Sequence, residues 1–170
     1  TSIINMVEER LRAAAGESEH EPVIVRFNPW LFSDQAQLTT QFFKQISNAF
    51  KKSSAVTRIG EFMEALGAAF EVASAVPVLG AKGRIMAKGM QVAGKGMAKG
   101  ILSPDIQEVK DQIVAELKKK KVKTIILIDD IDRLSNQEIR AVFQLIKSIA
   151  DFPNTVYLLA FDYEIVTRAL

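Results

Sequence analysis

The sequence TIILIDDIDRL, residues 124–134, contains the feature that decides the fold. Its first five residues are apolar or β-branched, and the run stops at Asp129 and Asp130. A short apolar run that ends in carboxylates predicts a buried strand with polar side chains at its carboxyl end. In open α/β sheets, ligands bind beyond the carboxyl ends of the strands. The two acids therefore stand where a ligand is expected.

The segments on both sides of this strand alternate between helical and strand patterns. Helical periodicity extends over residues 2–15, 35–52, 105–121 and 136–150, and a further helix begins near Glu164. The apolar stripe of the second helix is formed by Leu38, Phe42, Ile46, Ala49 and Phe50. Apolar runs predict two more strands, at residues 23–28 and 155–161, the second of which ends at Asp162. Alternation of this kind predicts an α/β fold, a three-layer sandwich with a parallel sheet between helices.

Two expectations concern the packing of particular side chains. In the first helix, a common face is shared by Ile3, Ile4, Val7, Leu11 and Ala14, while Glu8, Glu9 and Arg12 are expected to face outward. Trp30 follows the first strand, and we expect its ring to pack in the core, because burial of an indole is strongly stabilising. The alternatives are that Trp30 packs near a nucleotide base or locks its loop. Arg26 is expected at a less buried position of its strand.

Residues 54–104 interrupt the alternation and predict a helical insert. Their first part, from Val56 to Ala73, has the pattern of one helix, whereas residues 80–100 contain six of the nine glycines. A basic helical face is formed there by Arg84, Lys88, Lys95 and Lys99. Such a face can contact an anionic membrane surface, an acidic partner or the phosphates of a nucleic acid. A solvated insert is the simpler interpretation, since each glycine weakens a helix by about 1 kcal/mol.

The organisation that follows from this pattern has three ranges. Residues 1–53 form the N-terminal part of the core, residues 54–121 the mainly helical insert, and residues 122–170 the second part of the same core. The nearly uncharged stretch from Ala65 to Ala81 is shorter than the roughly 20 apolar residues of a membrane span. Glu71 and Pro77 also interrupt it, which favours a buried or partner-facing helix.

Composition limits the classes of function. The 170 residues carry a net charge of +2, which is too small to indicate nucleic-acid binding by itself. There is no cysteine, which excludes a disulfide framework, a thiol nucleophile and the usual structural zinc sites. The absence of cysteine also fits a reducing compartment.

The paired acids suggest a specific chemistry. Magnesium prefers one or two carboxylates together with phosphate oxygens and water, so Asp129 can hold Mg²⁺ beside a nucleotide through water. Asp130 can then orient or deprotonate the attacking water. The alternative is that acids before a helix act as caps. Capping can explain Asp132, but it explains poorly two adjacent acids at the end of a buried strand.

The N-terminus contains the end of a second, incomplete motif. A phosphate-binding loop reads G-x-x-x-x-G-K-[ST], and its last residue opens a helix and contacts magnesium. The chain starts with TSIINM, a hydroxyl residue that opens an amphipathic helix, and Thr1 fits the last position. A simple helix cap is the alternative. The glycines and the lysine of the motif are absent, so this chain alone is not expected to bind or hydrolyse nucleotide in the normal way.

Four segments together resemble the KAP family of P-loop NTPases, near the STAND and AAA+ proteins. These are TSIINMVEERL, VRFNPWLFSD, TIILIDDIDRLSNQEIRAVFQLIK and YLLAFDYEIVTRAL. The resemblance implies an incomplete P-loop NTPase core that begins at the last residue of the Walker A motif and contains a Walker B strand. It implies that Thr1 and Asp129 bind Mg²⁺, that Asp130 acts on the catalytic water, and that Thr1, Ser2 and Asp162 contact nucleotide. It also suggests Arg133 as a residue that acts in trans on a neighbouring subunit, although a solvated salt bridge is the simpler role for it.

The resemblance implies an ATP-hydrolysing conformational switch or motor domain in a larger protein. ATP is favoured over GTP by this likeness alone. Bacterial relatives are associated with phage exclusion and animal relatives with membrane signalling scaffolds, so a cytoplasmic, membrane-associated or homo-oligomeric protein is compatible with it. The main alternative is a non-catalytic interaction module that uses the basic insert. A nucleic-acid-stimulated ATPase is a third hypothesis, marked by a strong salt dependence of binding.

Overall fold

The computed structural model describes residues 2–15, 21–32, 35–52, 54, 56–75 and 106–170. Along the chain these residues form α1 (Ser2–Ala15), β1 (Val23–Phe27), the 3-10 turn η1 (Pro29–Leu31), α2 (Gln35–Lys51), α3 (Thr57–Ala75), α5 (Ile106–Lys120), β2 (Thr124–Ile128), the 3-10 turn η4 (Ile131–Arg133), α6 (Asn136–Gln144), the π-helical turn η5 (Leu145–Ile149), β3 (Thr155–Leu159) and α7 (Tyr163–Ala169). The strand at residues 124–128 and the helix at residues 2–15 have the predicted bounds, and the other strands and helices differ from prediction by a few residues at their ends.

The three described strands form one parallel sheet in the order β1-β2-β3. The register aligns Phe27 of β1 with Ile128 of β2 and Leu159 of β3, so the carboxyl ends of all three strands lie level. β2 is the central strand, and the residue that follows it is Asp129. The parallel sheet and its flanking helices confirm the predicted α/β class.

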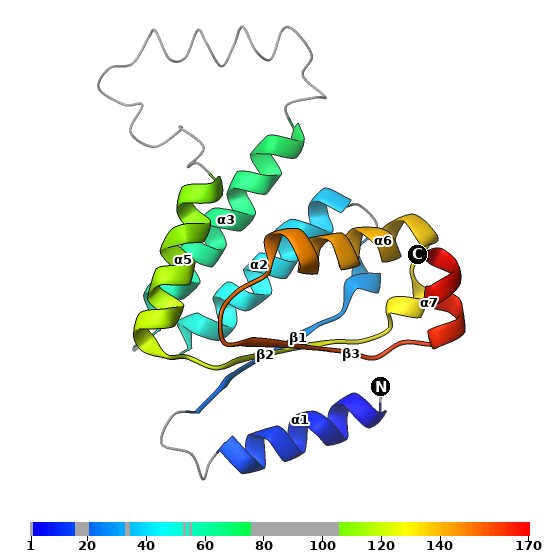
Figure 1. Ribbon diagram of the computed structural model, residues 1–170, viewed down its shortest axis with the longest axis horizontal. Helices are drawn as coiled ribbons and strands as arrows, with labels where there is room; N and C mark the ends of the chain where they lie inside the picture. The colour runs from blue at the N-terminus through cyan, green and yellow to red at the C-terminus, as the bar shows by residue number, and fades with distance from the viewer. Residues whose placement is uncertain (1, 16–20, 33–34, 53, 55, 76–105) are drawn as a thin grey trace, which may run out of the picture.

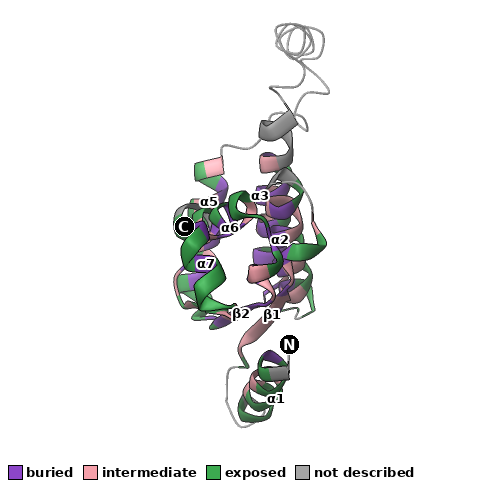
Figure 2. Ribbon diagram, turned by 90° about the vertical axis from the view of Figure 1, so that its right-hand side faces the viewer, coloured by how far each residue is buried: buried purple, intermediate pink, exposed green. Residues whose placement is uncertain are grey.

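Helices cover the two faces of this sheet in two outer layers, as Figures 1 and 2 show. α1 lies alone on one side, and α2, α3, α5 and α6 lie on the other. α1 runs back beneath the strands, so that its N-terminal end lies near the carboxyl ends of the strands (Figure 1). This arrangement is the predicted three-layer sandwich.

The main hydrophobic core lies between the sheet and α2. In α2 the predicted apolar stripe is buried at Leu38, Phe42, Ile46 and Phe50, and Phe43 is buried beside it. The Phe42 ring meets the rings of Phe27 and Phe43 edge-on, at centroid distances of 5.2 and 5.3 Å. Since edge-to-face aromatic pairs add to the free energy of burial, these three rings fix α2 against β1.

The helices α3 and α5 pack into this same core, although they lie in the range expected as a helical insert. The side chains that they bury in this core include Ile59, Met63, Leu66, Val109, Ile113 and Leu117, and Val56 is buried just before α3. Gly60 of α3 lies so close to α2 that an added Cβ would stand 2.8 Å from the carbonyl oxygen of Ser47. The absence of a side chain at this position therefore sets the distance between the two helices.

Several packing expectations for the α1 side of the sheet are wrong. Ile4 is buried, but Ile3, expected on the same inward face, is 68% exposed. Glu8, expected outward, instead contacts Arg26 of β1. On β3, Val156 and Leu158 point to the α1 side and are exposed, although an entirely apolar strand suggests two covered faces. Periodicity in the sequence thus identified α1 and β3, but it did not show how much of the surface of each is covered by other parts of the chain.

The predicted helix at residues 136–150 is interrupted near its end. It is α-helical from Asn136 to Gln144 and continues as the π-helical turn η5, where the N–H of Ala150 donates to the carbonyl oxygen of Leu145 at 3.0 Å. Its start is set by Ser135 and Glu138, which form a reciprocal capping box. The cap is therefore Ser135, and Asp132, for which capping was a possible explanation, has another partner.

Candidate functional site

Asp129 lies at the centre of the carboxyl edge of the sheet, directly after β2. Its side chain is only 4% exposed. The N–H of Asp129 donates to the carbonyl oxygen of Phe27 at 3.3 Å, which extends the β1–β2 pairing by one residue and fixes the backbone. A carboxylate that is removed from water in this way must be neutralised by cations or hydrogen-bond donors.

The carboxylate of Asp129 contacts the backbone of Asp130 and the side chain of Arg26. Its Oδ1 accepts a hydrogen bond from the N–H of Asp130 at 3.0 Å. Its Oδ2 lies 3.4 Å from Nη2 of Arg26, which reaches it from the neighbouring strand β1. Both oxygens are thus oriented by groups on the sheet itself.

Asp130 has a left-handed backbone, with φ 59° and ψ 33°. This conformation is unfavourable for most residues, but aspartate tolerates it better than bulky residues do. It ends the strand and starts η4, and the Asp130 side chain makes no cap hydrogen bond there. Its Oδ1 instead lies 3.0 Å from Nε of Arg133, and 15% of the side chain is exposed. Water can therefore reach the second acid, whereas the first is almost enclosed.

The structure contradicts the expectation that Trp30 packs in the core. This residue is 44% exposed. The Arg133 guanidinium lies over its ring, with 5.7 Å between the central carbon and the ring centroid. A cation at this distance from an indole face is attracted to it. Trp30 thus links η1, after β1, to η4, after β2, which is the loop-locking alternative. The contact of Arg133 with Asp130 is the predicted salt bridge, and a role of Arg133 in trans stays a prediction.

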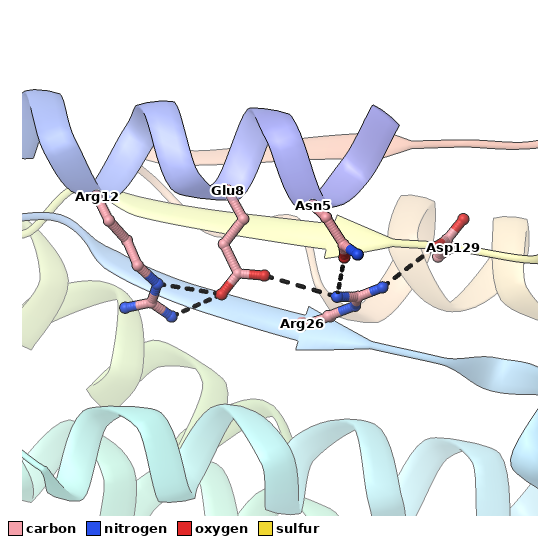
Figure 3. A network of polar contacts seen from close by, with 5 residues as sticks. All are labelled: Asn5, Glu8, Arg12, Arg26 and Asp129. Atoms are coloured by element: carbon pink, nitrogen blue, oxygen red, sulfur yellow. Dashed lines mark hydrogen bonds and ion pairs between the residues drawn. The ribbon is translucent and has the colours of Figure 1, made fainter. Parts of the chain in front are cut away.

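Arg26 is the residue of this site that the sequence analysis missed. Its Nη1 donates to Oδ1 of Asn5 at 2.5 Å and lies 3.8 Å from Oε2 of Glu8, both on α1. Its Nη2 reaches Asp129, so one guanidinium joins α1 to the end of β2 (Figure 3). Glu8 in turn accepts from Nη2 of Arg12 at 2.8 Å. The one available signal was a charged residue inside an otherwise apolar strand.

Asp162 occupies the expected place at the end of β3, where it caps α7. Its Oδ1 accepts hydrogen bonds from the N–H groups of Glu164 and Ile165 at 2.9 and 3.2 Å. Its own N–H donates to Oδ1 of Asp132 at 3.4 Å, which connects the loops after β2 and β3. The capping alternative is therefore observed, and contact of Asp162 with a nucleotide stays a prediction.

Some predicted site residues lie outside the described part of the chain. Thr1 is one of them, and for Ser2 the structure describes the backbone but not the side chain. The basic face of Arg84, Lys88, Lys95 and Lys99 also lies outside it. The hydrogen bond from Arg26 to Asn5 brings the beginning of α1 to the same edge of the sheet as Asp129.

A known protein family matches the whole chain. The family model described as the KAP family P-loop domain matches residues 1–170. The chain belongs to the KAP family. A relative in Escherichia coli (strain K12), the Phage T7 exclusion protein, is 32% identical to this KAP domain over 63 residues. The match includes 37% of this chain but only 8% of the length of the relative. No solved structure matches the KAP domain.

A KAP family P-loop domain implies nucleotide binding, usually with Mg²⁺, and the donors at this edge fit that ion. Mg²⁺ takes oxygen ligands and is usually held by one or two carboxylates. The described edge offers the carboxylates of Asp129 and Asp130. Asn28, one residue past the β1 partner of Ile128, adds a buried amide oxygen that has no hydrogen-bond partner among the residues that the structure describes. Among the described residues, no three His, Cys, Asp or Glu side chains form a metal cluster.

None of the helices in the described part of the chain is both long enough and apolar enough to cross a bilayer. The described helix α3 contains the first part of the nearly uncharged stretch that begins at Ala65, and the rest of that stretch lies outside the description.

Proposed function

We propose that this edge of the sheet is the metal and catalytic half of an ATP-hydrolysing site. In this proposal Asp129 holds Mg²⁺ through water, together with the hydroxyl group of Thr1 at the start of α1. Asp130 orients and deprotonates the water that attacks the γ-phosphate. ATP is preferred to GTP only because of the likeness to the family.

The observation that carries the proposal is the contrast between the two adjacent acids. Asp129 is almost fully enclosed and held on both oxygens, which suits a ligand whose position must not change. Asp130 is reachable by solvent and is turned out of the strand by its left-handed backbone. A water-activating base needs this access, and a metal ligand benefits from the rigidity.

Bound Mg²⁺ would neutralise charge that develops on the phosphates, and the residues of the chain supply the rest of the mechanism. Before the metal binds, Arg26 and the backbone of Asp130 keep the Asp129 carboxylate facing one way. Arg133 holds Asp130 through Oδ1, and Trp30 in turn supports Arg133. Asp162 is proposed to contact the nucleotide from the next strand, and Ser2 from the beginning of α1.

The biological role that we propose is a conformational switch in a larger protein that excludes phage. This part of the proposal is supported by the name of the Escherichia coli relative and by no residue of the site. Assembly into a homo-oligomer, with Arg133 acting on a neighbouring subunit, is a further expectation. The non-catalytic alternative, in which the basic insert contacts a partner or a membrane surface, is tested by the same experiment.

The test is the substitution Asp130→Asn in the full-length protein. Because general-base catalysis contributes about 10²- to 10⁴-fold, we expect ATP turnover to fall by about that factor while nucleotide binding is retained. Steady-state phosphate release and equilibrium nucleotide binding measure the two quantities. Asp111→Asn is the matched control, since Asp111 is an exposed aspartate on α5 that bonds to Gln107. Unchanged turnover, or unchanged phage exclusion, in the Asp130 variant would favour the interaction module.

A further inference from the structure

Arg26 stands in an unusual position for a strand residue. It is in register with Leu127 of β2, and it points to the side of the sheet that α1 covers. Because Asp129 is two residues beyond Leu127, the Arg26 side chain needs to extend only a short way along the sheet to reach it. The guanidinium meets three oxygen-bearing side chains, those of Asn5, Glu8 and Asp129 (Figure 3).

The contact with Asp129 solves an electrostatic problem. A carboxylate that is 4% exposed carries a large desolvation cost unless a positive charge or strong donors compensate it. Arg26 supplies that charge from within the chain. Its own side chain is 35% exposed, so it can change partners at a lower cost than a fully buried cation could.

Arg26 and a bound divalent cation compete for the same carboxylate. Two cations that share one carboxylate repel each other, and a divalent ion attracts it more strongly than a guanidinium does at equal distance. The guanidinium has other acceptors within reach on α1. Its 3.8 Å distance to Oε2 of Glu8 is longer than a hydrogen bond, which leaves room for this contact to shorten.

We propose that Arg26 is the built-in counterion of Asp129, which gives way when Mg²⁺ binds and then binds Glu8 more closely. Arg26 is thus a positioning residue that couples metal binding to the packing of α1. This inference rests on the proposed metal-dependent nucleotide site. It adds that the chain opposes metal binding with its own cation, and that α1 responds to the metal through Arg26.

The decisive variant is Arg26→Gln in the full-length protein, with ADP present at a saturating concentration. Mg²⁺ is titrated, and the metal concentration that gives half of the maximal thermal stabilisation is compared with that of the wild type. Removing a competing charge at this distance is expected to lower that concentration by about tenfold. A residue that only supports the fold would leave it unchanged or raise it.

Arg12→Gln is the matched control. It removes the same charge from the same network, but the contacts of Arg12 in this network are with Glu8 rather than with Asp129. Its side chain is largely exposed, so we expect the half-maximal Mg²⁺ concentration to change by less than about twofold. An equal shift in both variants would show a general charge effect and would overturn the inference.

Asn5→Ala gives an independent result if Arg26→Gln does not fold. It keeps the cation but removes one of its acceptors on α1, so the guanidinium relies more on Asp129. The half-maximal Mg²⁺ concentration should rise by about threefold, the reverse of the effect of Arg26→Gln. A fall in this variant would overturn the inference.

Amide hydrogen exchange directly measures the coupling between Mg²⁺ binding and the packing of α1. In the wild type, Mg²⁺ should increase protection of the turn around Glu8, and in Arg26→Gln this increase should be lost. If the wild type shows no response to Mg²⁺, the proposed site and the inference both fail. If the wild type responds and Arg26→Gln requires as much metal or more, the inference alone fails.

Discussion

Phe42 and Ile4 are equally well buried, but they lie on opposite faces of the sheet and have different surroundings. Phe42 belongs to a continuous cluster contributed by α2, α3, α5, α6 and the strands. Ile4 is the one buried residue among those of α1 whose burial is described, and its helix is otherwise attached to the sheet by the polar contacts of Arg26. The first face is held by apolar area and the second mainly by a charge network.

This difference separates stability from chemistry. A substitution that leaves a cavity in an apolar cluster lowers the free energy of unfolding, but such a cluster responds little to charge. A charge network responds to any ion that enters it, because each partner can be exchanged for another. The candidate metal carboxylate, Asp129, belongs to the charge network through its contact with Arg26. The sheet thus presents a rigid face and an adjustable face, and the substitutions below test that distinction.

The largest effect on folding is expected from Phe42→Ala. The substitution removes the ring that meets Phe27 and Phe43 edge-on, and it leaves a cavity in the main core. The free energy of unfolding should fall by about 4 kcal/mol. Urea denaturation of the full-length protein measures this loss. A loss below about 1 kcal/mol would mean that the core collapses around the gap, which would remove the contrast between the two faces.

A smaller and more local effect is expected from Ile4→Ala. Since α1 has little other buried apolar area, the substitution should release this helix while the main core stays folded. Amide exchange should show loss of protection in α1 alone, and the global free energy of unfolding should change by less than about 1 kcal/mol. A loss as large as that of Phe42→Ala would show that both faces belong to one cooperative unit.

A further small effect at neutral pH is expected from Tyr157→Phe on the core side of β3. The phenol donates to the carbonyl oxygen of Ala150 at 2.5 Å, so the free energy of unfolding should fall by about 1 kcal/mol. Burial, with a smaller contribution from Asp151, raises the pKa of Tyr157 above its ordinary value. The folded state therefore retains this proton at a pH where the unfolded state has lost it.

The sign of the resulting pH dependence follows from linkage. The contribution of Tyr157 is complete below about pH 10, the ordinary pKa of a phenol, and it decreases by about 1.4 kcal/mol per pH unit above that value. The wild type should thus lose stability faster than Tyr157→Phe as the pH rises beyond 10, and the two curves should approach each other. Thermal unfolding between pH 8 and 11, a range about the ordinary phenol pKa, measures this difference. Parallel curves would contradict it.

Much of this architecture could be predicted from local patterns in the sequence. The strand at residues 124–128 and the buried stripe of α2 were predicted correctly, because apolar periodicity reflects which side chains are removed from water. The position of Asp129 and Asp130 at the carboxyl edge also followed, since the two acids come directly after the strand in the sequence. The outer faces were predicted less well. Trp30 and Ile3 are largely exposed, because an apolar residue in the sequence does not by itself show whether enough of the chain packs over it.

The sequence by itself determined the order of strands and helices along the chain, the identity of the two acids and their placement at the end of a buried strand. Only the tertiary structure decided which cation meets which acid. Arg26 and Asp129 are 103 positions apart in the chain, and they meet because the β1–β2 register and the packing of α1 bring their side chains to one face. Local periodicity encodes burial, whereas a pairing across strands depends on the geometry of the whole sheet.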